Sequence, residues 1–218
     1  MDDKLWAEVD NYLTSQLIKP DPVLAEARAN SDAAGLPSIA VAENQGKFLN
    51  LLARFGRVRT ALELGTLGGY STIWLGRALP EDGRLLTLEA NPKHAEVARA
   101  NIAAAGLAGI VEVRVGAALD LLPGIDEAFD LIFIDADKNN YPEYFRWSLR
   151  LSHRGTLIIA DNVVRQGKVA DATTSDPLVL GVRRMHELIA AEPRVEATAL
   201  QTVGIKGHDG FAVVLVTS

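Results

Sequence analysis

The segment Glu63-Leu64-Gly65-Thr66-Leu67-Gly68-Gly69-Tyr70-Ser71 decides the fold, because it joins an apolar run to a helical pattern through a glycine-rich turn. The apolar run Thr60–Leu64 predicts a strand, and Ser71–Leu79 predicts the helix that follows it. Glycines allow the backbone to approach a ligand closely, and a helix N-terminus supplies free N–H groups. This segment therefore predicts a ligand-binding turn in an α/β protein.

Short apolar runs and helical patterns continue to alternate after this turn. The predicted strands are Leu85–Leu88, Ile110–Val115, Leu131–Ile134 and Leu157–Ala160. The predicted helices between and after them are Pro92–Ala105, Leu119–Leu122, Tyr141–Leu151 and Pro177–Ala191. Strands that alternate with helices predict βαβ units, and hence a mostly parallel sheet with helices on both faces.

The C-terminal part breaks this alternation. Two strand-like runs, Val195–Val203 and Phe211–Val216, follow each other without a helix between them. The link Gly204–Gly210 is short and rich in glycine, so it predicts a hairpin in which one late strand runs antiparallel to the rest.

The N-terminal quarter is predicted to be helical. Leu5, Val9, Tyr12 and Leu13 recur at helical spacing, and further helical patterns cover residues 22–34 and 43–55. We interpret their apolar stripes as core or subunit contacts. The length of 218 residues suits a single domain, with N-terminal helices over residues 1–56 and a Rossmann-like core over residues 57–218.

Composition narrows the classes of function. Hydrophobic residues make up 48% of the chain and charged residues 23%, which is typical of a globular protein. The net charge of −6 argues against nucleic acid as a partner. The chain has no cysteine, an acidic start (Met1-Asp2-Asp3-Lys4) and no apolar run near the roughly 20 residues that span a bilayer. These features favour a cytoplasmic protein without disulfides, thiolate metal sites or a membrane anchor.

Polar residues or glycines follow each predicted parallel strand, where ligands of open α/β sheets bind. They are the glycine-rich segment itself, Glu89, Gly116-Ala117, Asp135-Ala136-Asp137-Lys138 and Asp161-Asn162. The glycines do not have the G-x-G-x-x-G spacing of dinucleotide-binding turns. Glu63 would oppose a pyrophosphate but suits a positively charged ammonium group. Glu89 lies at the distance expected of an acid that binds ribose hydroxyls, so an adenosine-containing cofactor is predicted.

Carboxylates after the predicted strands Leu131–Ile134 and Leu157–Ala160 indicate a metal site. Asp135, Asp161 and Asn162 offer hard oxygen ligands at neighbouring strand tips, a set that favours Mg²⁺, with Mn²⁺ or Ca²⁺ as alternatives. A lysine beside a metal loses its proton more easily, so Lys138 could act as general base towards a substrate hydroxyl. Alternatively, Lys138 has no catalytic role and only forms a surface salt bridge with Asp135 or Asp137.

Other functions remain open on these residues. A basic rim of Arg165, Lys168, Arg183 and Arg184 would suit a methyltransferase acting on a hydroxylated tRNA base, although a solvated helix face and loop is the commoner explanation of these residues. An NAD-dependent oxidoreductase shares the sheet and Glu89 but does not need the predicted metal ligands. A non-catalytic adenosine-binding protein leaves those ligands and Lys138 unexplained.

Three motifs together resemble the cation-dependent O-methyltransferases of the caffeoyl-CoA and catechol type. They are Glu63–Ser71, Phe133-Ile134-Asp135-Ala136-Asp137-Lys138 with Asn140-Tyr141, and Asp161-Asn162, and the resemblance runs from about Ile39 to the hairpin. It implies S-adenosylmethionine as cofactor, a homodimer, and a seven-stranded sheet with the last strand reversed. It also implies metal ligation by Asp135, Asp161 and Asn162, and catalysis by Lys138 and Asp135. The implied cofactor contacts are Val41, Glu63, Gly65, Thr66, Ser71, Glu89, Ala117, Asp135 and Asp137.

The chain departs from the plant pattern after the Asp161-Asn162 pair. Plant members typically have a tryptophan there, whereas this chain continues with Val163-Val164-Arg165. The loop Gln166–Asp176 and the N-terminal segment also match the plant pattern poorly. We therefore expect a small hydroxylated aromatic substrate, a catechol-like compound with two adjacent hydroxyls, rather than caffeoyl-CoA.

Overall fold

The structure is a computed structural model that describes residues 3–218; Met1 and Asp2 of the acidic start lie outside them. Within this range, seven strands form one sheet in the order β3-β2-β1-β4-β5-β7-β6. The strands are β1 (Thr60–Leu64), β2 (Arg84–Glu89), β3 (Val111–Val115), β4 (Phe129–Ile134), β5 (Ser152–Asp161), β6 (Val195–Gly204) and β7 (Gly207–Val216). Strands β1 to β5 pair in parallel, and β7 runs antiparallel to both β5 and β6. The predicted mostly parallel sheet with a reversed hairpin strand is confirmed.

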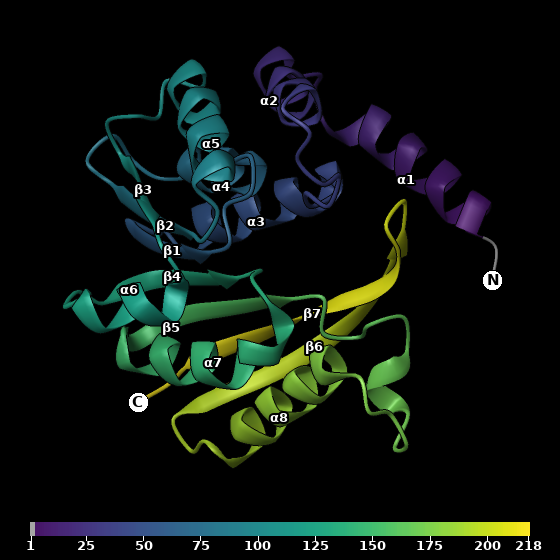
Figure 1. Ribbon diagram of the computed structural model, residues 1–218, viewed down its shortest axis with the longest axis vertical. Coiled ribbons are helices and arrows are strands. Elements are labelled where there is room, and N and C mark those ends of the chain that lie inside the picture. The colour runs from purple at the N-terminus through teal and green to yellow at the C-terminus, as the bar shows by residue number, and fades with distance from the viewer. Residues whose placement is uncertain (1–2) are drawn as a thin grey trace.

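Helices occupy both faces of this sheet (Figure 1). They are α1 (Asp3–Leu17), α2 (Pro22–Ala33), α3 (Glu43–Phe55), α4 (Tyr70–Gly76), α5 (Pro92–Ala104), α6 (Ala118–Leu121), α7 (Tyr141–Arg150) and α8 (Pro177–Ala191). Short 3₁₀ turns follow α6 and precede α7, and a third lies in the loop before α8. None of the helices within residues 3–218 combines the length and apolarity needed to cross a lipid bilayer.

Alternate residues of the central strands point to opposite faces and give two buried cores. On one face, Ala61, Leu85 and Phe133 pack with side chains of α2, α3, α4 and α5. On the other face, Leu62 and Ile132 pack with side chains of α7 and α8. This three-layer arrangement is the one that a strand–helix alternation predicts.

Several predicted boundaries differ from those in the structure; β5, for example, begins at Ser152 rather than at Leu157. The hairpin link is shorter than expected, since β6 continues to Gly204 and β7 begins at Gly207, leaving Ile205 and Lys206 as the turn. Gly207 has φ +84°, which glycine adopts without strain and which lets the chain reverse so tightly. Helix α4 ends at Gly76 rather than Leu79, because Arg77 occupies the C-cap position.

The N-terminal helices differ in how they are held. Helix α3 packs closely on α4, where a Cβ on Gly46 would lie 2.2 Å from the Trp74 ring. Helix α1 contacts α3 and β6 but buries none of its residues, so its apolar stripe is not part of the core.

The glycine-rich turn after β1 is anchored by Asn101 of α5, which is buried. Its amide nitrogen donates to the carbonyl oxygens of Gly68 (2.9 Å) and Ala27 (3.2 Å), and its Oδ1 accepts from Asn30 (3.0 Å). One side chain thereby joins the turn, α2 and α5.

A buried carboxylate supports the same turn from below. Glu63 in β1 is fully buried and accepts hydrogen bonds from Ser71 (2.6 Å), Thr87 (2.7 Å) and Thr72. Burial raises the pKa of Glu63 to about 7, although the three hydroxyl groups act in the opposite direction. Glu63 therefore links β1 and β2 to the start of α4. Its ionised form lowers the free energy of unfolding relative to its neutral form, because the charge is buried.

We expect Asn101→Ala to lower the free energy of unfolding by about 2 kcal/mol, because it leaves buried carbonyl oxygens without their donor. Denaturant unfolding measures this change. Asn139→Ala, at an exposed position, is the matched control and should stay within about 0.5 kcal/mol of the unsubstituted protein. Equal losses in the two variants would contradict the anchoring role.

Glu63 should make the stability depend on pH. Because its pKa is raised on folding, its contribution is most favourable below the usual carboxyl pKa and declines as the pH rises through about 7. Between pH 5 and 8, the unsubstituted protein should lose about 3 kcal/mol relative to Glu63→Gln. Denaturant unfolding of both proteins across this range measures the difference, and parallel curves would show that Glu63 does not titrate there.

Candidate active site

A cavity of about 1030 Å³ opens at the C-terminal ends of β1, β2, β4 and β5. Strand β1 lies between β2 and β4, so this edge is the point where strand order reverses and where ligands of such sheets bind. Of the predicted site residues, those that line the cavity are Val41, Gly65, Thr66, Ser71, Glu89, Ala117, Asp135, Asp137, Lys138, Asp161 and Asn162.

Glu63 is the one predicted site residue that does not line this cavity within residues 3–218. Its carboxylate lies beneath the glycine-rich turn and contacts the cavity wall through Ser71. Sequence reasoning placed a charge at this strand end correctly, but the alternation of side chains along β1 directs it into the interior.

Glu89 is the last residue of β2, and its carboxylate accepts hydrogen bonds from the backbone of the glycine-rich turn. Its Oε2 accepts from the backbone N–H groups of Thr66 (3.2 Å) and Leu67 (2.8 Å), and its Oε1 accepts from that of Asn91 (2.9 Å). A carboxylate has about four acceptor positions, so Glu89 keeps about one position to accept from a hydroxyl group in the cavity.

The glycine-rich turn also lies against the end of β4. A Cβ on Gly65 would lie 2.4 Å from the carbonyl oxygen of Asp135, and Gly65 has φ +95°. Both facts require glycine at this position. The turn and the acidic group after β4 are thus held in direct backbone contact.

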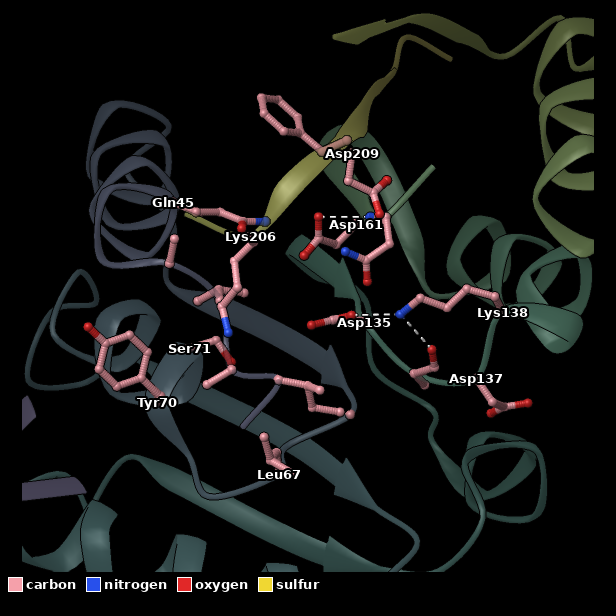
Figure 2. Close-up of a pocket in the computed structure, with 18 of the residues that line it drawn as sticks. Gln45, Leu67, Tyr70, Ser71, Asp135, Asp137, Lys138, Asp161, Lys206 and Asp209 are labelled. Carbon is pink, nitrogen blue, oxygen red and sulfur yellow. Dashed lines mark hydrogen bonds and ion pairs between the residues drawn. The ribbon is translucent and has the colours of Figure 1, made fainter. Parts of the chain in front are cut away.

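The acidic residues after β4 and β5 face one another with Lys138 beside them (Figure 2). Lys138 Nζ donates to Asp135 Oδ1 at 2.8 Å and to the carbonyl oxygen of Ala136 at 2.9 Å. Burial raises the pKa of Asp161 well above its usual value, and the charge of Asp135 adds to this effect. Two carboxylates held this closely favour a cation between them.

The loop after β5 positions the amide of Asn162. Asn162 has φ +56°, an uncommon conformation for a residue other than glycine, and its N–H donates to Asp161 Oδ1 at 2.8 Å. Asp209 of β7 accepts from the N–H groups of Val164 and Arg165, both at 3.0 Å. The loop is therefore fixed by the hairpin strand.

The donor set fits a divalent cation only if Asn162 takes part. Within residues 3–218 there is no group of three or more His, Cys, Asp or Glu side chains arranged to hold a metal. Asp135 and Asp161 supply two carboxylates, and Asn162 supplies an amide oxygen at the same cavity. Mg²⁺ is commonly bound by one or two carboxylates, with substrate and water completing its shell.

Sequence reasoning missed several residues of this cavity. Gln45 of α3 hydrogen-bonds to Asp161, and Tyr144 of α7 donates to Asp137. Lys206 and Asp209 reach the cavity from the hairpin, which was treated as a turn only. No sequence motif marks these positions. Gln45, Lys206 and Asp209 are distant in the chain from the ends of β1, β2, β4 and β5, and only the fold brings them to the cavity.

The predicted basic rim is not formed as a group. Arg165 lines the cavity, whereas Arg183 donates to the carbonyl oxygen of Asp171 and Arg184 pairs with Glu187. Lys168 is exposed and lies outside the cavity lining among the described residues.

Comparisons with known proteins agree with this geometry. A model of the O-methyltransferase family matches residues 14–215. The catechol O-methyltransferase of Niastella koreensis is 51% identical over 220 residues, covering 99% of this chain and 100% of that protein.

Solved structures of O-methyltransferases have the same fold. The Bacillus cereus enzyme, in complex with S-adenosylhomocysteine, has a TM-score of 0.98 and 56% identity, covering 99% of this chain and 100% of that one. TomG of Streptomyces achromogenes, involved in tomaymycin synthesis and solved with S-adenosylmethionine, has a TM-score of 0.97 and 49% identity, covering 100% of both chains. Matches of this extent favour methyl transfer over the hydride transfer that Glu89 alone left open, and the chain belongs to the O-methyltransferase family.

Proposed function

We propose that the protein transfers a methyl group from S-adenosylmethionine to one hydroxyl of a catechol-like small molecule, with a divalent cation held by Asp135, Asp161 and Asn162. The observation that carries this proposal is the pair of carboxylates, Asp135 and Asp161, placed beside Lys138 at the end of the sheet. The name of the Niastella koreensis relative supports a catechol as acceptor.

The cofactor half of the cavity is formed by the glycine-rich turn and Glu89. Glu89 would accept from a ribose hydroxyl with its remaining acceptor position, and Gly65 allows the cofactor to lie close to the backbone. Val41, Thr66, Ser71 and Ala117 line the same half, with Asp137 near its border. Relatives solved with S-adenosylhomocysteine and S-adenosylmethionine support this ligand.

The acceptor half is formed by Asp135, Lys138, Asp161 and Asn162. A bound divalent cation would supply charge that lowers the pKa of an acceptor hydroxyl and fixes its position. Lys138, in its neutral form, would take the hydroxyl proton on Nζ, which the hydrogen bond to Asp135 keeps at this point of the cavity. The acceptor oxygen then forms a bond to the methyl carbon as the bond from that carbon to sulfur breaks. Positioning and charge placement supply most of the acceleration.

The first test is to incubate the protein with S-adenosylmethionine and a panel of catechols, with Mg²⁺ or with EDTA, and to measure S-adenosylhomocysteine. We expect product only with the metal. Equal product in EDTA would refute the metal mechanism while leaving methyl transfer intact. Binding of the cofactor without product from any catechol would refute the acceptor class, and tRNA transcripts would be tested next.

A substitution of Asp135 tests whether the metal site and the cofactor site can be disabled separately. Asp135→Ala should reduce metal-dependent turnover by on the order of 100-fold or more, because it removes a ligand and the partner of Lys138. Calorimetry should show nearly unchanged affinity for S-adenosylhomocysteine. The exposed Asp126→Ala serves as control. Loss of both turnover and cofactor affinity would show that the two sites are not separable in this way.

We also propose that the protein is a homodimer whose interface includes α1. Helix α1 buries no residue, yet Val9 and Tyr12 are 47% and 65% exposed, and Phe55 at the end of α3 is 90% exposed. A helix without a buried face gains little stability from its own chain, and exposed apolar residues of this size are typical of interfaces.

Sedimentation velocity at several concentrations tests the dimer. Tyr12→Lys should shift the population towards monomer, because a charge would be buried in the interface. Leu180→Lys changes an exposed apolar residue of α8 and is the control. A monomeric unsubstituted protein at all concentrations would refute the proposal.

A further inference from the structure

The turn between β6 and β7 places a lysine at the cavity on the side opposite the acidic residues. Lys206 lines the cavity, and its Nζ donates to the carbonyl oxygen of Ser38 at 3.1 Å. Figure 2 shows its side chain extending from the hairpin towards Ser71, while Asp135 and Asp161 lie on the other side. The ammonium group is thus directed at the part of the cavity bounded by the loop before α3 and the start of α4.

A second cation, Arg28, contacts Val41, which lines the same cavity. The guanidinium group of Arg28 lies over the ring of Tyr70, 4.1 Å from its centroid, and donates to the carbonyl oxygen of Val41 at 2.9 Å. Partial burial, and then the charge of Arg28, lower the pKa of Lys206. Within residues 3–218, no ion pair joins Lys206 or Arg28 to a carboxylate. This wall of the cavity therefore favours an anion.

Asp10 of α1 contacts the β6–β7 turn, and Asn44 of α3 contacts Asp10. Asp10 of α1 accepts from the N–H of Ile205 at 2.8 Å and from the amide of Asn44 at 2.9 Å. A Cβ on Gly204 would lie 2.1 Å from Asp10 Oδ2, so the contact between α1 and the hairpin is close. The carboxylate of Asp10 is engaged by the turn backbone, which leaves Lys206 directed into the cavity.

The charged side chains around the cavity suit different parts of the cofactor. S-adenosylmethionine carries a ribose with two hydroxyls, a positive sulfonium and an amino acid part with a carboxylate. Glu89 suits the ribose, and Asp135 and Asp161 are the proposed ligands of the divalent cation, so neither group offers a hydrogen-bond donor to a carboxylate.

We propose that Lys206 binds the carboxylate of the cofactor's amino acid part, and that the β6–β7 turn is thereby a cofactor-binding element. This role rests on the proposed use of S-adenosylmethionine. The bound carboxylate would join the hairpin, the loop before α3 and the start of α4, which are far apart in the sequence. Lys206 is then a determinant of cofactor affinity that acts through charge rather than through the fold of the turn.

A comparison of two ligands isolates this contact. Calorimetry would measure the affinity of S-adenosylhomocysteine and of its decarboxylated analogue, which keeps the amine and lacks only the carboxylate. In Lys206→Met, we expect binding of S-adenosylhomocysteine to weaken about 10-fold, since a charge-assisted hydrogen bond is lost, while the analogue binds as before. Lys206→Arg should retain most of the affinity, and Lys168→Met, at an exposed position, should change neither ligand.

Each other outcome has a distinct meaning. Equal weakening of both ligands in Lys206→Met would overturn the proposal, because it would show that Lys206 only holds the loop through Ser38. Unchanged affinity for S-adenosylhomocysteine would overturn it as well. If the unsubstituted protein bound neither ligand, the proposed use of S-adenosylmethionine would fail, and the role of Lys206 would fail with it.

Discussion

Strands β1 and β4 are neighbours at the centre of the sheet, and the chain leaves β1 with Gly65 against the backbone of Asp135. This contact brings the turn that Glu89 holds and the carboxylates after β4 and β5 to the walls of one cavity. Any side chain at position 65 would separate them by forcing the two strand ends apart. The distance between the two halves of the site is therefore set by backbone packing and not by the flexible side chains that line it.

Charge is distributed unevenly around this cavity, so its different sides favour different groups of a ligand. Carboxylates lie at the ends of β2, β4 and β5, with Lys138 paired to one of them. Lys206 lies on the opposite side, and the charge of Arg28 acts on it. Opposite charges attract across the cavity and like charges repel. A ligand with a positive centre and separate anionic and hydroxyl groups would be oriented before any reaction begins.

Much of the fold could be predicted from the sequence because strands, helices and turns carry local patterns. The glycine-rich segment, Asp135 and Asp161 were found because strand ends in parallel sheets converge on one edge. Lys206 and Gln45 could not be found this way, since only the packing of the hairpin and α3 brings them to that edge. The direction of Glu63 was missed because a strand end gives no local signal for which face its side chain takes. The hairpin link was overestimated because glycine is common in loops and also occurs within β7.

The position of β7 in the sheet has a consequence for biosynthesis. β7 lies between β5 and β6, although it is the last strand of the sheet in the chain, and it supplies Asp209, which fixes the loop carrying Asn162. A nascent chain can therefore form the β3-β2-β1-β4-β5 portion while the ribosome is still translating, but not a finished cavity. The gap beside β5 stays open until residues 207–216 emerge, which exposes a strand edge that chaperones or other chains can bind. Competence for catalysis is thus acquired in one late step, when the final strand closes the sheet.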